Sequence, residues 1–203
     1  MLMRNTLVVV GALALLAATA AAQATGTASY NAPYRAFEQY EFGGTLSFNQ
    51  GDVTGVEGQI RFGYKAFDIG GRGGMLLTDG DDSAVLGVEG RGRVLTHSEQ
   101  FPVDGAIIAG FGIVTNGPSF NIPLGLSLGR RVEFENSEIS IVPYLQPTLN
   151  MVFGDNVDGA EFGFGAGFGL DARLSKFFDV RLSAGLGTDW AMEGFAVSAV
   201  WIR

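Results

Sequence analysis

The feature that most constrains the fold is a two-residue alternation of apolar and polar side chains that recurs along most of the chain. Residues 160–174 read "AEFGFGAGFGLDARL", in which every second residue from Phe162 to Leu174 is apolar and the residues between are glycine or charged. Successive side chains of a β-strand point to opposite faces of the sheet, so such a strand has one apolar and one polar or bare face. Helical spacing of apolar residues is not sustained after residue 39, which predicts an all-β domain.

The same alternation divides residues 40–203 into segments separated by short turn clusters. The turn residues are strong in "DGDD", "TNGP" and "GDN". They are weaker at Asp68 and at "SK" (175–176), so we expect ten strands, with eight as the alternative. The predicted strands are 40–50, 56–67, 69–78, 83–95, 101–114, 120–132, 139–153, 160–174, 177–187 and 194–203.

Alternation alone is compatible with two environments. A soluble sandwich or lipocalin-type barrel would bury the apolar face, whereas a membrane barrel turns it toward lipid and keeps the polar face in the lumen. Only 17% of the residues are charged, the polar face is rich in glycine, and the apolar face is uncharged in 56–66, 84–94, 120–128, 162–174 and 178–186. A soluble surface is usually ~25–35% charged. A small barrel could not hold so many Phe and Leu side chains inside.

These observations favour a closed antiparallel up-and-down transmembrane β-barrel, because lipid tolerates no open sheet edge. The side chains expected to face lipid are Ile60, Phe62, Leu86, Leu124, Leu126, Phe164, Phe168 and Leu182. Aromatic residues gather near the segment ends. Those at one end of the expected barrel include Tyr40, Phe177 and Trp201, and those at the other end include Phe153, Phe162 and Trp190. Two such groups are typical of interfacial girdles.

The polar faces carry a set of charges that we expect to line the lumen. These residues are Glu57, Arg61, Lys65, Arg72, Glu89, Arg91, Arg93, Asp104, Asp171, Arg173, Asp179 and Arg181. They should pair, because an unpaired buried charge is costly. One interpretation is a salt-bridge network that plugs the lumen, and the other is a narrow, weakly anion-preferring pore lined by the excess of basic residues. The lumen-facing glycines of 163–169 would leave space for arginines from neighbouring strands.

The N-terminal residues predict export. Arg4 precedes the apolar run "TLVVVGALALLAATAAA", and small residues follow it, which is the pattern of a secretory signal peptide. We assign 1–24 to the signal peptide, with cleavage after Ala22 as the alternative. Residues 25–39 have no clear period, so we expect a flexible N-terminal extension, followed by the barrel at 40–203.

Composition excludes several kinds of chemistry. The net charge of −8 argues against a nucleic-acid partner. The chain has no cysteine and one histidine, His97, so we expect no cofactor and no transition-metal site. The acidic stretches "DGDD" and "GDNVDG" are interpreted as solvated loops, with weak divalent-cation contact as the alternative. A catalytic triad needs groups that converge from separate elements, and the neighbours of His97 do not supply one.

The chain resembles the small outer-membrane β-barrel proteins of Gram-negative-type bacteria, the class of the OmpA transmembrane domain. The resemblance is carried by the signal peptide, the alternating strands, "IVPYLQPTL", "LSKFFDVRLSAGLG" and the final "GFAVSAVWIR". It implies contact with outer-membrane lipid, a monomer, and recognition of the last strand by the barrel-assembly machinery. Members usually end in an aromatic residue, whereas this chain ends Ile202–Arg203.

The resemblance implies a non-enzymatic role that is structural, surface-interacting or that of a narrow pore. Two alternatives stay open. A soluble secreted barrel could bind an apolar ligand, and an outer-membrane lipid-modifying enzyme would have to use His97, the only histidine of the chain.

Overall fold

A computed structural model describes residues 24–33, 39–155, 157–188 and 193–203. The signal peptide predicted at 1–24 lies outside these residues except for Ala24, as do Trp190 and residues 34–38 of the predicted extension. The strands are β1 (Tyr40–Asn49), β2 (Val53–Tyr64), β3 (Phe67–Leu77), β4 (Ser83–Leu95), β5 (Asp104–Val114), β6 (Ser119–Gly129), β7 (Val132–Glu133), β8 (Ser140–Gly154), β9 (Ala160–Ser175), β10 (Phe178–Gly187) and β11 (Gly194–Ile202). No helix in the described part is long and apolar enough to cross a membrane.

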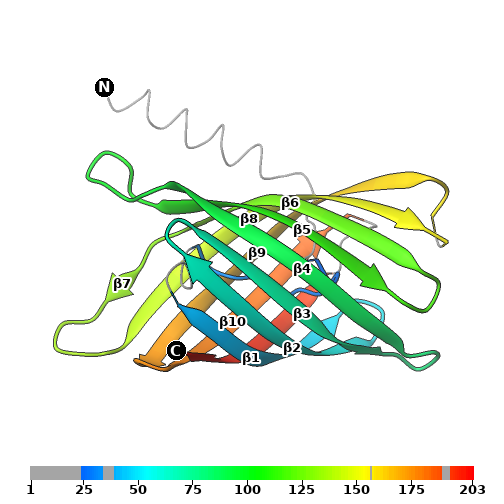
Figure 1. The fold of residues 1–203 in the computed structure, drawn as a ribbon, viewed down its shortest axis with the longest axis horizontal. Helices are drawn as coiled ribbons and strands as arrows, with labels where there is room; N and C mark the ends of the chain where they lie inside the picture. Colours follow the sequence, from blue (N-terminus) through cyan, green and yellow to red (C-terminus); the bar gives the residue numbers. More distant parts are fainter. Residues whose placement is uncertain (1–23, 34–38, 156, 189–192) are drawn as a thin grey trace.

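The long strands form a closed antiparallel barrel in which sequence neighbours are hydrogen-bonded neighbours (Figure 1). Closure comes from two pairings: β1 with β11, for example Thr45 with Ser198, and β6 with β8, for example Leu124 with Leu149. The extra strand β7 pairs with β8 beyond the end of β6. The prediction of a transmembrane β-barrel with ten strands rather than eight is therefore confirmed, with β7 as a short addition.

The turn between β2 and β3 differs from the predicted one. Tyr64 pairs with Phe67, so the turn consists of Lys65 and Ala66. Lys65 has a φ of 56°, in the left-handed region. Asp68, which we expected at the turn because aspartate is a common turn residue, instead lies on β3 with its side chain in the lumen, 5% exposed.

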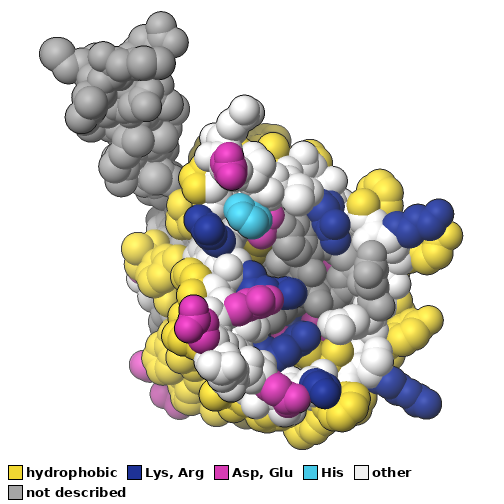
Figure 2. All heavy atoms as spheres, turned by 90° about the vertical axis from the view of Figure 1, so that its left-hand side faces the viewer, with side chains coloured by type: hydrophobic (Ala, Val, Ile, Leu, Met, Phe, Trp, Pro, Cys, Tyr) yellow, Lys and Arg dark blue, Asp and Glu magenta, His cyan; other side chains and the backbone are white. Residues whose placement is uncertain are grey.

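The exterior of the barrel is apolar and the interior is polar (Figure 2). Of the side chains predicted to face lipid, seven are exposed on the outer surface: Ile60, Phe62, Leu86, Leu124, Phe164, Phe168 and Leu182. Leu126 is half-buried. The soluble alternative required the apolar residues inside, and the barrel has the opposite arrangement.

Aromatic rings contact one another near both ends of the barrel. Near one end, Trp201 stacks on Phe42 and meets Phe178 edge-on, with centroid distances of 5.9 and 5.2 Å. Near the other end, Phe120 stacks between Phe111 and Phe153. Such contacts between exposed rings are typical of the girdles at membrane interfaces.

The β6–β8 seam accommodates one of the two prolines of β8, Pro147. Pro143 and Pro147 lie on the outward side, between buried residues such as Val142 and Gln146. The ladder runs from Ser119 to Gly125 and resumes at Leu128, so it is interrupted opposite Pro147. Because proline has no backbone N–H, this interruption is where a missing donor is tolerated.

Candidate functional site

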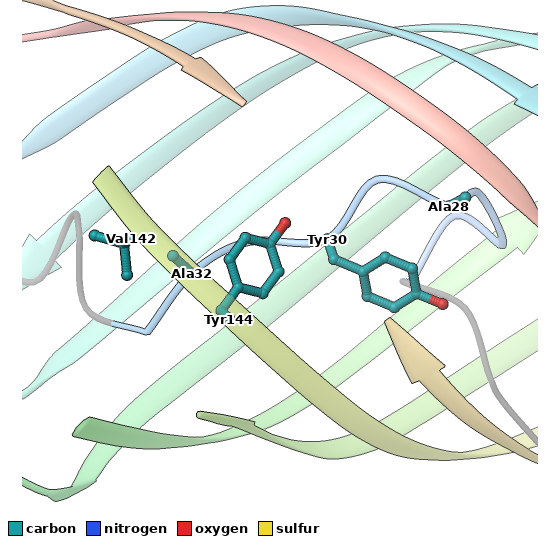
Figure 3. Packing of buried hydrophobic residues seen from close by; sticks show 5 residues of the cluster. All are labelled: Ala28, Tyr30, Ala32, Val142 and Tyr144. Atoms are coloured by element: carbon teal, nitrogen blue, oxygen red, sulfur yellow. The ribbon is translucent and has the colours of Figure 1, made fainter. Parts of the chain in front are cut away.

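The lumen holds a segment of the chain that is not part of the sheet. Residues 24–33, which we call the lumen segment, run between the walls of the barrel (Figure 3). Ala28 and Ala32 are fully buried and Tyr30 is 1% exposed. The sequence predicted a flexible extension at 25–39. Residues 25–33 of that stretch lie instead in the interior of the barrel.

Side chains of the walls bind the backbone of the lumen segment from several directions. The Arg72 guanidinium on β3 donates to Ser29 O at 3.0 Å and to Ser29 Oγ at 3.1 Å. On β10, Ser183 Oγ donates to Ala28 O at 2.8 Å and accepts from Tyr30 N at 3.2 Å. These bonds supply the donors and acceptors that a buried backbone needs when it has no ladder partner.

The lumen segment connects strands that do not touch each other. Ala32 N donates to Asp171 Oδ2 on β9 at 3.4 Å, and Ala32 O accepts from Arg91 Nη1 on β4 at 2.6 Å. In the barrel, β5, β6 and β8 separate β4 from β9. Asn31 makes a similar connection, because its backbone oxygen accepts from Ser127 on β6 and its Oδ1 accepts from Arg181 on β10.

Glycines of β9 and β10 make room for tyrosines. A Cβ on Gly167 would lie 2.3 Å from the Tyr30 ring, and one on Gly185 would lie 2.7 Å from the Tyr30 hydroxyl. A Cβ on Gly169 would lie 2.5 Å from the hydroxyl of Tyr144, which stands on β8 beside the lumen segment (Figure 3). The space that we assigned to arginines is therefore occupied by Tyr30 and Tyr144.

The charged side chains form ion pairs along the wall. On β2, β3 and β4, Arg61 bonds to Asp68 and, at 2.6 Å, to Glu89. Arg91 donates to both oxygens of Asp68, at 3.1 Å to Oδ1 and at 2.8 Å to Oδ2. Each pair joins strands that are close in the sheet order, so this cluster lines the wall.

A second cluster lies on β1, β9 and β10. Arg181 contacts Glu41 at 2.7 Å, Asp171 at 3.3 Å and Asp179 at 3.7 Å. Arg173 binds Asp179 at 2.8 Å. The two clusters meet where Glu41 pairs in register with Arg61. Figure 2 views the barrel end on, and acidic and basic side chains gather within the apolar ring.

The structure places most of the predicted lumen charges inside the barrel. Glu57, Arg61, Arg72, Glu89, Arg91, Asp104, Asp171, Asp179 and Arg181 are buried, and Arg93 and Arg173 are half-buried. The assignment of Lys65 was wrong, because it lies exposed in the β2–β3 turn with its ammonium 5.0 Å from the Tyr64 ring.

Two acidic lumen residues were missed, Glu41 and Asp68, and they reverse the expected charge balance. Among the described residues, the buried carboxylates are Glu41, Glu57, Asp68, Glu89, Asp104, Asp171 and Asp179, against the buried arginines Arg61, Arg72, Arg91 and Arg181 and the half-buried Arg93 and Arg173. The excess of basic residues, on which an anion preference rested, is absent. Extending the parity of the other strands to β1 would have found Glu41.

His97 lies exposed in the connection between β4 and β5, and its backbone N–H donates to Asp104 Oδ1 at 2.5 Å. The contact uses the main chain of His97 and leaves the imidazole outside the lumen clusters. Within the described ranges, no group of three or more His, Cys, Asp or Glu residues is arranged to hold a metal ion. The most developed constellation of polar groups is therefore the lumen itself.

A family model and solved structures of other proteins match this chain. The family model described as "Outer membrane protein beta-barrel domain" matches residues 10–191. The beta domain of the Bordetella autotransporter Brka matches with a TM-score of 0.52 at 15% identity, over 81% of this chain and 98% of that one. A bacterial polysaccharide outer membrane secretin gives 0.44 at 12% identity, over 74% of this chain and 56% of that one.

The search of the curated proteins found no match. The similarity to the autotransporter domain concerns the fold alone, because the sequence identity is low. The family match covers most of the strands described above and agrees with the closed barrel and its apolar exterior. The chain belongs to the outer membrane protein beta-barrel domain family.

Proposed function

We propose that this protein is a non-enzymatic integral outer-membrane barrel whose resting state is closed to ions and whose role is structural or surface-presenting. A cleaved signal peptide would direct its export to the outer membrane of a Gram-negative cell. The barrel-assembly machinery would recognise its last strand, in which Phe195, Val197 and Trp201 point outward. Its surroundings would be outer-membrane lipid, and it would act as a monomer, because sheet closure leaves no long strand without two neighbours.

The observation that carries the closed state is the occupied lumen. The wall charges pair along the wall, and the lumen segment then fills the space between opposite walls through Ala32, Asn31 and Tyr30. A barrel of about eight to ten strands has an interior that side chains can nearly fill. A further backbone inside it leaves little room for a permanent aqueous path.

The non-enzymatic part of the proposal rests on the character of the polar groups. The buried carboxylates and arginines bond mainly to one another or to the lumen segment, as structural ion pairs do. The exposed imidazole of His97 stands apart from them. Acid–base or nucleophilic catalysis needs such groups to converge on a substrate position.

Planar-bilayer recording tests the closed state. Purified wild-type protein, with its folding verified by heat-modifiable gel mobility, should give no sustained conductance steps at low applied potential. Empty detergent micelles serve as the blank. Regular, long-lived steps from the folded wild-type protein would refute a closed resting state and favour a constitutive narrow pore.

A further inference from the structure

We infer that residues 24–33 are a displaceable plug over a weakly cation-preferring passage, so that the barrel has an open state besides its closed one. The inference rests on the closed state proposed above and extends it. The lumen segment donates and accepts hydrogen bonds mostly with wall side chains, and it has no place in the ladders that connect the strands. Water that enters an open lumen can replace these hydrogen bonds, so each of them contributes only a small net stabilisation to the plugged state.

The wall is complete without the lumen segment. Each long strand has two strand neighbours, and the ion pairs of Arg61, Arg91 and Arg181 with carboxylates are all contacts within the wall. Residues 24–33 contain no charged side chain. Displacement of the segment therefore breaks no ion pair between side chains.

In the open state, Glu57 and Arg72 can form a salt bridge with each other in place of their hydrogen bonds to the lumen segment. Within the described part of the chain, neither has a salt-bridge partner: Glu57 Oε2 accepts from Thr27 Oγ1 at 2.7 Å, and Arg72 binds Ser29 and Gln59. Gln59 pairs with Arg72 in register, which places Glu57 diagonally across from Arg72 on the same face. Diagonal neighbours are roughly 7–8 Å apart, within reach of long side chains. The two residues can thus pair once the segment leaves.

The charge of the wall sets the expected selectivity. The buried carboxylates outnumber the buried and half-buried arginines among the described residues, so the field in an open lumen is weakly negative. Rings of carboxylates favour cations. The open passage should therefore prefer small cations. The sequence predicted an anion preference instead, because Lys65 was counted among the lumen charges and Glu41 and Asp68 were left out.

The experiment compares three proteins in planar bilayers: wild type, a chain lacking residues 25–33, and Thr25→Cys/Gly87→Cys. A Cβ on Gly87 would lie 3.1 Å from Thr25 Cγ2, so the two sulfurs are within reach of a disulfide. The native chain has no cysteine, so no other disulfide competes. The matched control is the Gly87→Cys single variant under the same oxidation.

We expect brief, rare openings from wild type at raised potential, none from the oxidised double variant, and their return on reduction. The deletion protein, if its gel mobility shows a folded barrel, should give sustained steps whose reversal potential in a KCl gradient indicates cations. A folded deletion protein as silent as wild type would overturn the inference and leave the closed barrel intact. Anion selectivity would overturn the assigned passage. Sustained conductance in wild type, unchanged by deletion, would refute the closed state itself.

Discussion

Leu182→Arg should destabilise the barrel in a membrane and lower the fraction of protein that assembles. Leu182 lies near the middle of β10 and points outward, with 47% of its surface exposed. Arginine at the bilayer midplane on the lipid face of a barrel costs roughly 2–4 kcal/mol. The free energy of unfolding measured by denaturant titration in lipid vesicles should fall by about this amount, and the fraction of heat-modifiable protein should fall with it.

Two matched variants separate charge from packing. Leu182→Met keeps an apolar side chain of similar volume and should behave as wild type. Thr96→Arg adds the same charge at an exposed position in the connection between β4 and β5 and should also insert normally. Normal insertion of Leu182→Arg would mean that this face does not meet lipid and that the barrel is oriented inside out.

Gly167→Val should destabilise the folded barrel through Tyr30. The Cβ of any residue at position 167 would stand 2.3–2.5 Å from three atoms of the Tyr30 ring. Overpacking of this kind typically costs about 1–3 kcal/mol. The free energy of unfolding in detergent micelles should fall by an amount in this range, because the ring must leave its position or the strand must shift.

A double-mutant cycle identifies Tyr30 as the partner. In a Tyr30→Ala background the clash is gone, so Gly167→Val should cost much less, with a coupling of about 0.5–3 kcal/mol. Gly58→Val is the matched control, because a Cβ there would have only Gly73 O within 4 Å, at 3.9 Å. Purely additive effects of the Tyr30 and Gly167 substitutions would place Tyr30 somewhere other than against β9.

The alternation of side chains is enough to predict the barrel, its strands and its faces. Alternate side chains of a strand lie on opposite faces of the sheet, so the face of every residue follows once the environment of one face is known. For this reason Leu182, Phe164 and Arg181 were placed correctly. The turn at 65–66 was missed because Asp68 carries a stronger turn propensity than Lys65, while the backbone makes Lys65 left-handed. That shift of a few residues moved one base out of the lumen and one acid into it.

The lumen segment could not be predicted from its own residues. The stretch "ATGTASYNAP" is short, uncharged and without period, so locally it resembles a linker. Its position depends on groups far away in the sequence, such as Arg72, Asp171 and Ser183. The glycines at 167 and 185 are a signal that something fills the lumen. A single sequence does not identify what fills it.

The lumen segment also bears on the two interpretations of the lumen charges, a plugged barrel or a narrow pore. The ion pairs alone leave the centre of the barrel unspanned, since they connect strands along the wall. The proposed closed state therefore rests on residues 24–33, and the salt bridges connect the strands of the wall around them. This division of roles is the reason why we propose that the barrel can open without unfolding.

Thiol accessibility tests the position of the lumen segment most directly. Ser29→Cys and Thr96→Cys each place a single cysteine in a chain that has none, at a buried lumen position and at an exposed position respectively. In folded protein, a bulky maleimide should label position 96 rapidly and position 29 many times more slowly, and both should react alike after denaturation. Equal labelling of the two positions in the folded protein would contradict a lumen closed by residues 24–33.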